Sequence, residues 1–120
     1  MQKTIQDFLL DLGILPNLKG FQHLVRLIEL YITAMQASQA IPKMGDLYRA
    51  VAVMESTTPP RVERSARHAI ERMFACTDMD TIRSMLRAPT DIVKGKFTNR
   101  EFVALAALHL HRVLKEGQNG

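Results

Sequence analysis

The sequence contains almost nothing that is typical of an exported or membrane-spanning protein. Cys76 is the one cysteine among 120 residues, so the chain cannot form an internal disulfide, which fits a reducing compartment. It has no run of about 18 apolar residues, the length that a membrane-spanning helix needs. Its first ten residues, MQKTIQDFLL, lack the charged and apolar regions of a signal peptide. We therefore expect one cytoplasmic domain that does not enter a membrane.

Signals for catalysis, metal binding or a cofactor are also missing. The sequence has no Gly-rich phosphate-binding loop. His109 and His111 would lie about 200° apart on a helix, so they cannot share a ligand face. Cys76 has no partner cysteine and is expected to be a small buried residue. These absences predict a protein that is not an enzyme and that carries neither a metal nor a cofactor.

Apolar residues recur at helical spacing along most of the chain, while signals for strands are weak. Turn signals divide the sequence into six predicted helices, at about residues 4–12, 20–36, 43–55, 60–76, 80–86 and 98–115. The predicted fold is an all-α, six-helix, bundle-like single domain over residues 1–120.

Several residues mark the expected ends of these helices. Thr4 with Asp7 resembles a capping box, and Gly13 can end the first helix in a left-handed turn. Thr98 or Asn99 is expected to cap the last helix. Residues 87–97 are predicted to form a loop or a small extended pair, and residues 116–120 are predicted to fray.

The net charge of +4 is unevenly distributed. Residues 1–60 hold five basic and five acidic side chains, whereas residues 61–120 hold eleven basic and seven acidic ones. An excess of positive charge in one half of a chain indicates an anionic partner for that half, and double-stranded DNA is a natural candidate.

Residues 61–74, RVERSARHAIERMF, concentrate this charge on one predicted helix. Five apolar residues fall within about a third of the helical circle and form an expected buried stripe: Val62, Ala66, Ala69, Ile70 and Met73. The opposite stripe holds Arg61, Arg64, His68 and Glu71, with Arg67 and Arg72 on its flanks.

A short turn at residues 56–60, STTPP, separates this helix from the preceding one. Helix, short turn and basic second helix predict a helix-turn-helix over about residues 43–76, whose second helix enters the major groove of DNA. Arginine matches O6 and N7 of guanine, and Glu63 can accept from the cytosine amino group. The alternative is an ordinary solvated face, because Glu63 and Arg67 have the i,i+4 spacing of a helix-stabilising pair.

The same residues resemble a known family. TTPPRVERSARHAIE, residues 57–71, closely resembles TTASRVERAIRHAIE of the DNA-binding effector domain of the stage-zero sporulation response regulator. GILPNLKGF, residues 13–21, resembles GVPAHIKGY, and KGKFTNREF, residues 94–102, resembles KAKPTNSEF. The likeness covers essentially the whole chain.

The resemblance implies a six-helix bacterial transcription regulator that binds boxes similar to TGTCGAA at the nucleoid. It implies base reading by Glu63, Arg64 and His68. It also implies phosphate contacts from Thr57, Thr58, Arg61, Arg67, Lys94 and Lys96. A sigma factor of RNA polymerase would contact residues 76–86, and a homodimer would form on tandem sites.

The sequence departs from this family at several places. Pro59 and Pro60 replace Ala-Ser, which removes a hydroxyl that can reach phosphate. Ser65 and Ala66 replace Ala-Ile, which trims an apolar side chain from the buried stripe. RAVAVME, residues 49–55, replaces PDIAKKF, which removes two lysines. We therefore expect weaker or differently placed phosphate anchoring.

Two further questions concern how the protein is regulated and whether its binding partner is DNA or another protein. The family joins this domain to a phosphorylatable receiver; without one, the effector domain is expected to bind DNA with no phosphorylation gate. A second hypothesis is a protein-interaction domain of the same fold that has lost specific DNA binding. Sequence preference and a steep loss of affinity with salt would distinguish DNA binding from this hypothesis.

Overall fold

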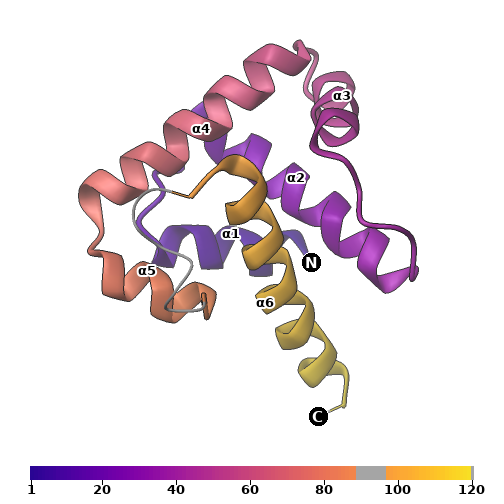
Figure 1. Ribbon diagram of the computed structural model, residues 1–120, viewed down its shortest axis with the longest axis vertical. Coiled ribbons are helices and arrows are strands. Elements are labelled where there is room, and N and C mark those ends of the chain that lie inside the picture. The colour runs from indigo at the N-terminus through magenta and orange to yellow at the C-terminus, as the bar shows by residue number, and fades with distance from the viewer. Residues whose placement is uncertain (89–96, 120) are drawn as a thin grey trace.

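Six α-helices make up the part of the chain that the computed structural model describes, residues 1–88 and 97–119 (Figure 1). They are α1 (Gln2–Asp11), α2 (Lys19–Gln36), α3 (Met44–Met54), α4 (Pro59–Cys76), α5 (Met79–Leu86) and α6 (Asn99–Asn119). The predicted all-α class with six helices is confirmed. Residues 89–96, where an extended pair was one alternative, lie outside the described residues.

Helix α2 is the centre of the fold and packs against α1, α3, α4 and α6 (Figure 1). Its sequence allows this because apolar residues occupy more than one face of the helix. The largest fully buried side chains of α2 are Leu24, Leu27, Ile28 and Ile32. Burial of each such side chain favours folding by about 1.5–3 kcal/mol, so α2 is the main hydrophobic support for the surrounding helices.

Gly20 permits an unusually close contact between α2 and α4. A Cβ atom at this position would lie 2.1 Å from the backbone oxygen of Ser65 and 2.8 Å from the Cβ of Ala69. No side chain fits into this space, so glycine in the first turn of α2 lets the two helix backbones approach each other.

The turn at the end of α1 has the expected left-handed residue. Gly13 has φ +89°, its N–H donates to Leu10 O, and Ile14 N–H donates to Leu9 O. This is the hydrogen-bond pattern of a Schellman motif, so the prediction that Gly13 ends the helix is confirmed.

The expected capping box at Thr4 is wrong. Helix α1 begins at Gln2, and Ile5 N–H already donates to Met1 O, so Thr4 lies inside the first turn. A capping box is instead present at α6, where Glu101 N–H donates to Thr98 Oγ1 and Thr98 N–H donates to Glu101 Oε1. Helix α6 also continues to Asn119, beyond the expected end near Lys115. Gly117 does not end it, since a glycine inside a helix costs only about 1 kcal/mol.

Cys76 is exposed, which corrects the expectation of a buried residue. It is the last residue of α4, and the buried stripe of that helix ends at Met73, one turn earlier.

Within the described ranges, none of the helices has the length and apolar character that crossing a membrane requires.

Candidate nucleic-acid interface

Helices α3 and α4 form the predicted helix-turn-helix. They pack against each other and are joined by Glu55, Ser56, Thr57 and Thr58. Ser56 has φ 53°, and Thr57 N–H donates to Ala52 O, so a serine holds the left-handed position that glycine often takes. Pro59 and Pro60 then open α4, where the missing N–H groups would have no helical partner.

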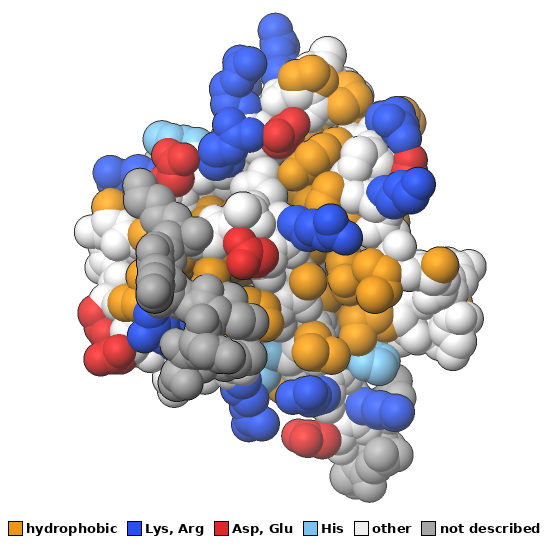
Figure 2. Space-filling view, in the orientation of Figure 1, with side chains coloured by type: hydrophobic (Ala, Val, Ile, Leu, Met, Phe, Trp, Pro, Cys, Tyr) orange, Lys and Arg blue, Asp and Glu red, His pale blue; other side chains and the backbone are white. Residues whose placement is uncertain are grey.

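Helix α4 has the two faces that its sequence predicts. The apolar stripe is buried: Val62, Ala66, Ala69, Ile70 and Met73. The opposite stripe and its flanks are exposed: Arg61, Arg64, Arg67, His68, Glu71 and Arg72. Figure 2 shows basic side chains along the upper left edge of the molecule, where α4 lies in Figure 1.

A pocket of about 450 Å³ lies between the start of α2 and the first half of α4. Its lining residues are Lys19, His23, Thr57, Arg61, Arg64, Ser65 and His68. We refer to it as the α2-side pocket. It brings together four of the predicted DNA-binding residues and adds Lys19 from α2. None of its lining residues is acidic, so the pocket is an electropositive surface suited to an anion.

His23 and Ser65 connect α2 to α4 beneath this pocket. His23 is 8% exposed, and its Nδ1 lies 2.5 Å from Ser65 Oγ. The Ser65 hydroxyl donates to Val62 O, so the histidine Nδ1–H is the donor in the other bond. Burial lowers the pKa of His23; the Glu55 carboxylate raises it and Lys19 lowers it further. His23 is therefore a neutral, hydrogen-bonded part of the helix contact at pH 7.

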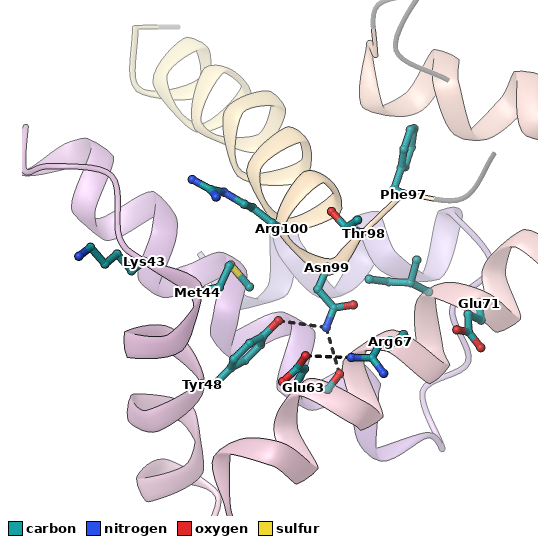
Figure 3. A pocket seen from close by; sticks show the side chains of 11 residues that line it. Lys43, Met44, Tyr48, Glu63, Arg67, Glu71, Phe97, Thr98, Asn99 and Arg100 are labelled. Carbon is teal, nitrogen blue, oxygen red and sulfur yellow. Dashed lines mark hydrogen bonds and ion pairs between the residues drawn. The ribbon is translucent and has the colours of Figure 1, made fainter. Parts of the chain in front are cut away.

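A larger groove of about 600 Å³ lies on the opposite side of α4, between α3, α4 and the start of α6 (Figure 3). We refer to it as the α6-side groove. Its lining includes Glu63 and Arg67, whose side chains form an ion pair at 2.8 Å and are each about half exposed. The candidate base-reading carboxylate of Glu63 is thus paired with a predicted phosphate-binding arginine in the free protein.

Asn99 fixes the start of α6 to both helices of the helix-turn-helix. Its Nδ2 donates to Tyr48 Oη at 3.1 Å and to the backbone oxygen of Glu63 at 3.0 Å (Figure 3). Asn99 is 8% exposed, so these bonds are protected from water. The expectation that Thr98 or Asn99 caps α6 is met by Thr98, and Asn99 has this tertiary role instead.

The remaining predicted site residues are separate from these two clusters. Thr58 is exposed at the N-cap position of α4 and makes no side-chain capping bond. Lys94 and Lys96 lie outside the described residues. The expected sigma-factor segment contains α5, which begins at an N-cap, Asp78, and packs its buried residues Ile82 and Leu86 inward.

The predicted DNA-binding residues did not include Lys19, Asn99 or Arg100, which all line one of the two cavities. Lys19 and Arg100 share a sequence signal that could have identified them. Each is a cation in the first turn of a helix, where the helix dipole disfavours positive charge. Asn99 carries no such local signal, because its partners are distant in the sequence.

The sequence also matches the model of a known protein family. Residues 5–110 match the family model described as sporulation initiation factor Spo0A C terminal. The match includes most of α1, all of α2 to α5 and the first half of α6, and therefore both cavities beside α4.

Proposed function

The chain belongs to the family of sporulation initiation factor Spo0A C-terminal domains, which are helical DNA-binding domains and not enzymes, and we propose that α4 is its recognition helix for TGTCGAA-like boxes. The observation that carries this proposal is the α2-side pocket. Arg61, Arg64 and His68 meet there with Lys19, and no carboxylate lines the surface. A phosphate backbone is the partner that such a surface favours.

Within this proposal, Arg64 is the central base-reading residue. It lies in the first half of α4, is exposed, and is on the side opposite the buried stripe. The first half of a recognition helix is the part that reaches the base edges, and a guanidinium matches guanine through two hydrogen bonds. His68 follows one turn later, and Thr57 and Arg61, in the same pocket, would contact the backbone phosphates.

Glu63 reads a base in this proposal only after its carboxylate leaves Arg67. The ion pair is half exposed, so breaking it costs about 1 kcal/mol or less. Once separated, Arg67 is free to contact a phosphate and Glu63 is free to accept from a cytosine amino group. On binding, the protein would thus replace one weak internal ion pair with two contacts to the duplex.

The test is fluorescence anisotropy with a duplex that carries TGTCGAA and with a scrambled duplex, each at two salt concentrations. The wild-type protein should prefer the box and lose affinity steeply with salt. Arg64→Ala should cost about 1–3 kcal/mol on the box and relax the preference for guanine at one position.

Arg72→Ala is the matched control, because Arg72 is also exposed on α4 but lies outside both cavities. It should leave the preference for the box unchanged. Equal effects of Arg64→Ala on both duplexes would contradict the recognition-helix assignment. Absence of wild-type binding to either duplex would favour a protein-interaction domain of the same fold.

The regulatory context belongs to the same proposal. The domain would act in the bacterial cytoplasm at the nucleoid, as a homodimer on tandem boxes. A sigma factor of RNA polymerase would contact the surface around residues 76–86. Support for that contact comes from the position of α5, which follows α4 directly and packs on α6.

A further inference from the structure

We infer that Arg100 binds a backbone phosphate on the α6 side of the recognition helix, and that it takes over part of the anchoring that this chain lost from α3. The inference rests on the proposed DNA-binding function and adds a residue to it. The related family segment has serine where this chain has Arg100.

The loss at α3 is visible on the surface. Val53 and Met54 occupy the positions of the two family lysines, at the end of α3 and next to the turn. Val53 is 81% exposed and Met54 is 44% exposed. Apolar side chains at such exposed positions gain little from burial, so the exchange removes two cations from the face without improving the core.

The positive charge that compensates for this loss lies in the α6-side groove. Arg100 and Lys43 both line it and both are exposed (Figure 3). The groove holds three cations, Lys43, Arg67 and Arg100, against the carboxylates of Glu63 and Glu71. Because Arg67 already pairs with Glu63, Lys43 and Arg100 are left against Glu71 alone. Neither of these two cations forms an ion pair within the described part of the chain.

Arg100 is held in a fixed place relative to α4. The residue before it, Asn99, is bonded to Tyr48 and to the Glu63 backbone, and Thr98 and Glu101 form the capping box around it. The Cα atom of Arg100 is therefore held in place beside the first half of the recognition helix. An anchored arginine loses less freedom on binding, which favours its contact with phosphate.

The position of Arg100 is also unfavourable for the stability of α6. It lies in the first turn of α6, where the partial positive charge of the helix dipole repels a cation. A residue that is unfavourable for its own helix, in a groove that adjoins the recognition helix, is consistent with selection for a ligand of negative charge.

The test uses Arg100→Ser, which installs the residue of the related family. We expect affinity to fall about 3- to 10-fold near 0.15 M salt, equally for the TGTCGAA duplex and the scrambled duplex. The slope of log K against log salt should become shallower by about 0.9, the value for one lost phosphate contact. The melting temperature should stay the same or rise slightly, since a cation leaves the α6 N-terminus.

Arg112→Ala is the matched control, because Arg112 is an exposed cation on the same helix outside the groove. It should change neither affinity nor slope. A second measurement adds Val53→Lys and Met54→Lys to Arg100→Ser, and the salt slope should recover. A triple variant that stays at the level of Arg100→Ser would overturn the replacement of α3 anchoring by Arg100.

The outcomes separate this inference from the proposed function. Unchanged affinity and slope in Arg100→Ser, with a wild-type protein that prefers the box, would overturn the Arg100 assignment alone. A loss confined to the TGTCGAA duplex would also overturn it, because a phosphate contact weakens binding to all duplexes alike. A wild-type protein that binds neither duplex would overturn the proposed function itself.

Discussion

At the scale of single residues, Asn99 connects three helices of the fold. It joins α6 to α3 through Tyr48 and to α4 through the Glu63 backbone. Because Asn99 is almost fully buried, its replacement removes one protected donor from the Glu63 backbone oxygen and one from the Tyr48 phenol. The loss of a hydrogen bond at a buried polar group costs free energy, because water cannot fully replace the missing donor.

Asn99→Ala is therefore expected to lower the free energy of unfolding by about 1–3 kcal/mol, measured by urea denaturation. Asn17→Ala is the control, because Asn17 is exposed in the segment between α1 and α2. Equal stability of the two variants would show that the Asn99 bonds contribute nothing net. Affinity for DNA should also fall in Asn99→Ala, since the start of α6 and the Glu63 segment lose their connection.

His23 makes stability depend on pH. Burial lowers its pKa below the ordinary value, so the unfolded chain binds a proton at a higher pH than the folded one. The free energy of unfolding should then decrease as the pH falls from about 7 towards 5, because the unfolded chain takes up the proton first. Urea denaturation at both pH values measures this decrease.

His23→Asn is the matched variant, because its amide N–H can replace the Nδ1 donor to Ser65 without titrating. Its stability should depend less on pH over the same range. Some dependence should remain, because burial also lowers the pKa of His109, with Arg87 and Arg112 acting in the same direction. A variant with the full wild-type dependence would contradict the role of His23.

At the scale of helices, the contact of α2 with α4 depends on the absence of a side chain. The backbone of α4 at Ser65 occupies the place where a Cβ of residue 20 would be. Backbone atoms cannot move aside as a flexible side chain can, so the two helices would have to separate.

Gly20→Ala should destabilise the domain by about 3 kcal/mol, in spite of the better helix propensity of alanine. Gly45→Ala is the control: its Cβ would meet only Arg49 Nη1 at 3.8 Å, so it should stabilise α3 by up to about 1 kcal/mol. Thermal denaturation followed by circular dichroism distinguishes the two. A neutral Gly20→Ala would mean that α2 and α4 can shift apart without cost.

At the scale of the whole molecule, positive charge gathers at the starts of helices. Lys19, Lys43, Arg61 and Arg100 lie at or near the first residues of α2, α3, α4 and α6. All four line one of the two cavities beside α4. The helix dipoles oppose this arrangement and the cations repel one another, so the free domain holds unfavourable electrostatic energy that an anion can relieve.

Salt should therefore act in opposite directions on folding and on binding. An increase from about 0.05 to 0.5 M NaCl should raise the melting temperature of the free domain, because it screens the repulsion. The same increase should weaken binding to DNA, because fewer counterions are released. A melting temperature that falls with salt would indicate that attractive pairs outweigh the repulsion.

Much of the structure of this protein follows from its local sequence. The spacing of Val62, Ala66 and Ile70 determines the buried face of α4, because residues three and four apart share a helix face. The same rule places Arg64 and His68 outward. The turn after α1 follows from Gly13, whose φ few other residues adopt easily. Such short-range patterns are enough for the six helices, the helix-turn-helix and the family.

Tertiary structure alone decided which of these faces meet. Ser65 contacts His23 from 42 positions away, and Asn99 reaches Tyr48 from 51 positions away. Cys76 proved exposed because it lies beyond Met73, where the buried stripe of α4 ends, and Thr4 proved to lie within a helix that starts earlier. No periodicity encodes such facts, since they depend on how closely helix backbones approach. That approach placed Lys19 and Arg100 on either side of α4.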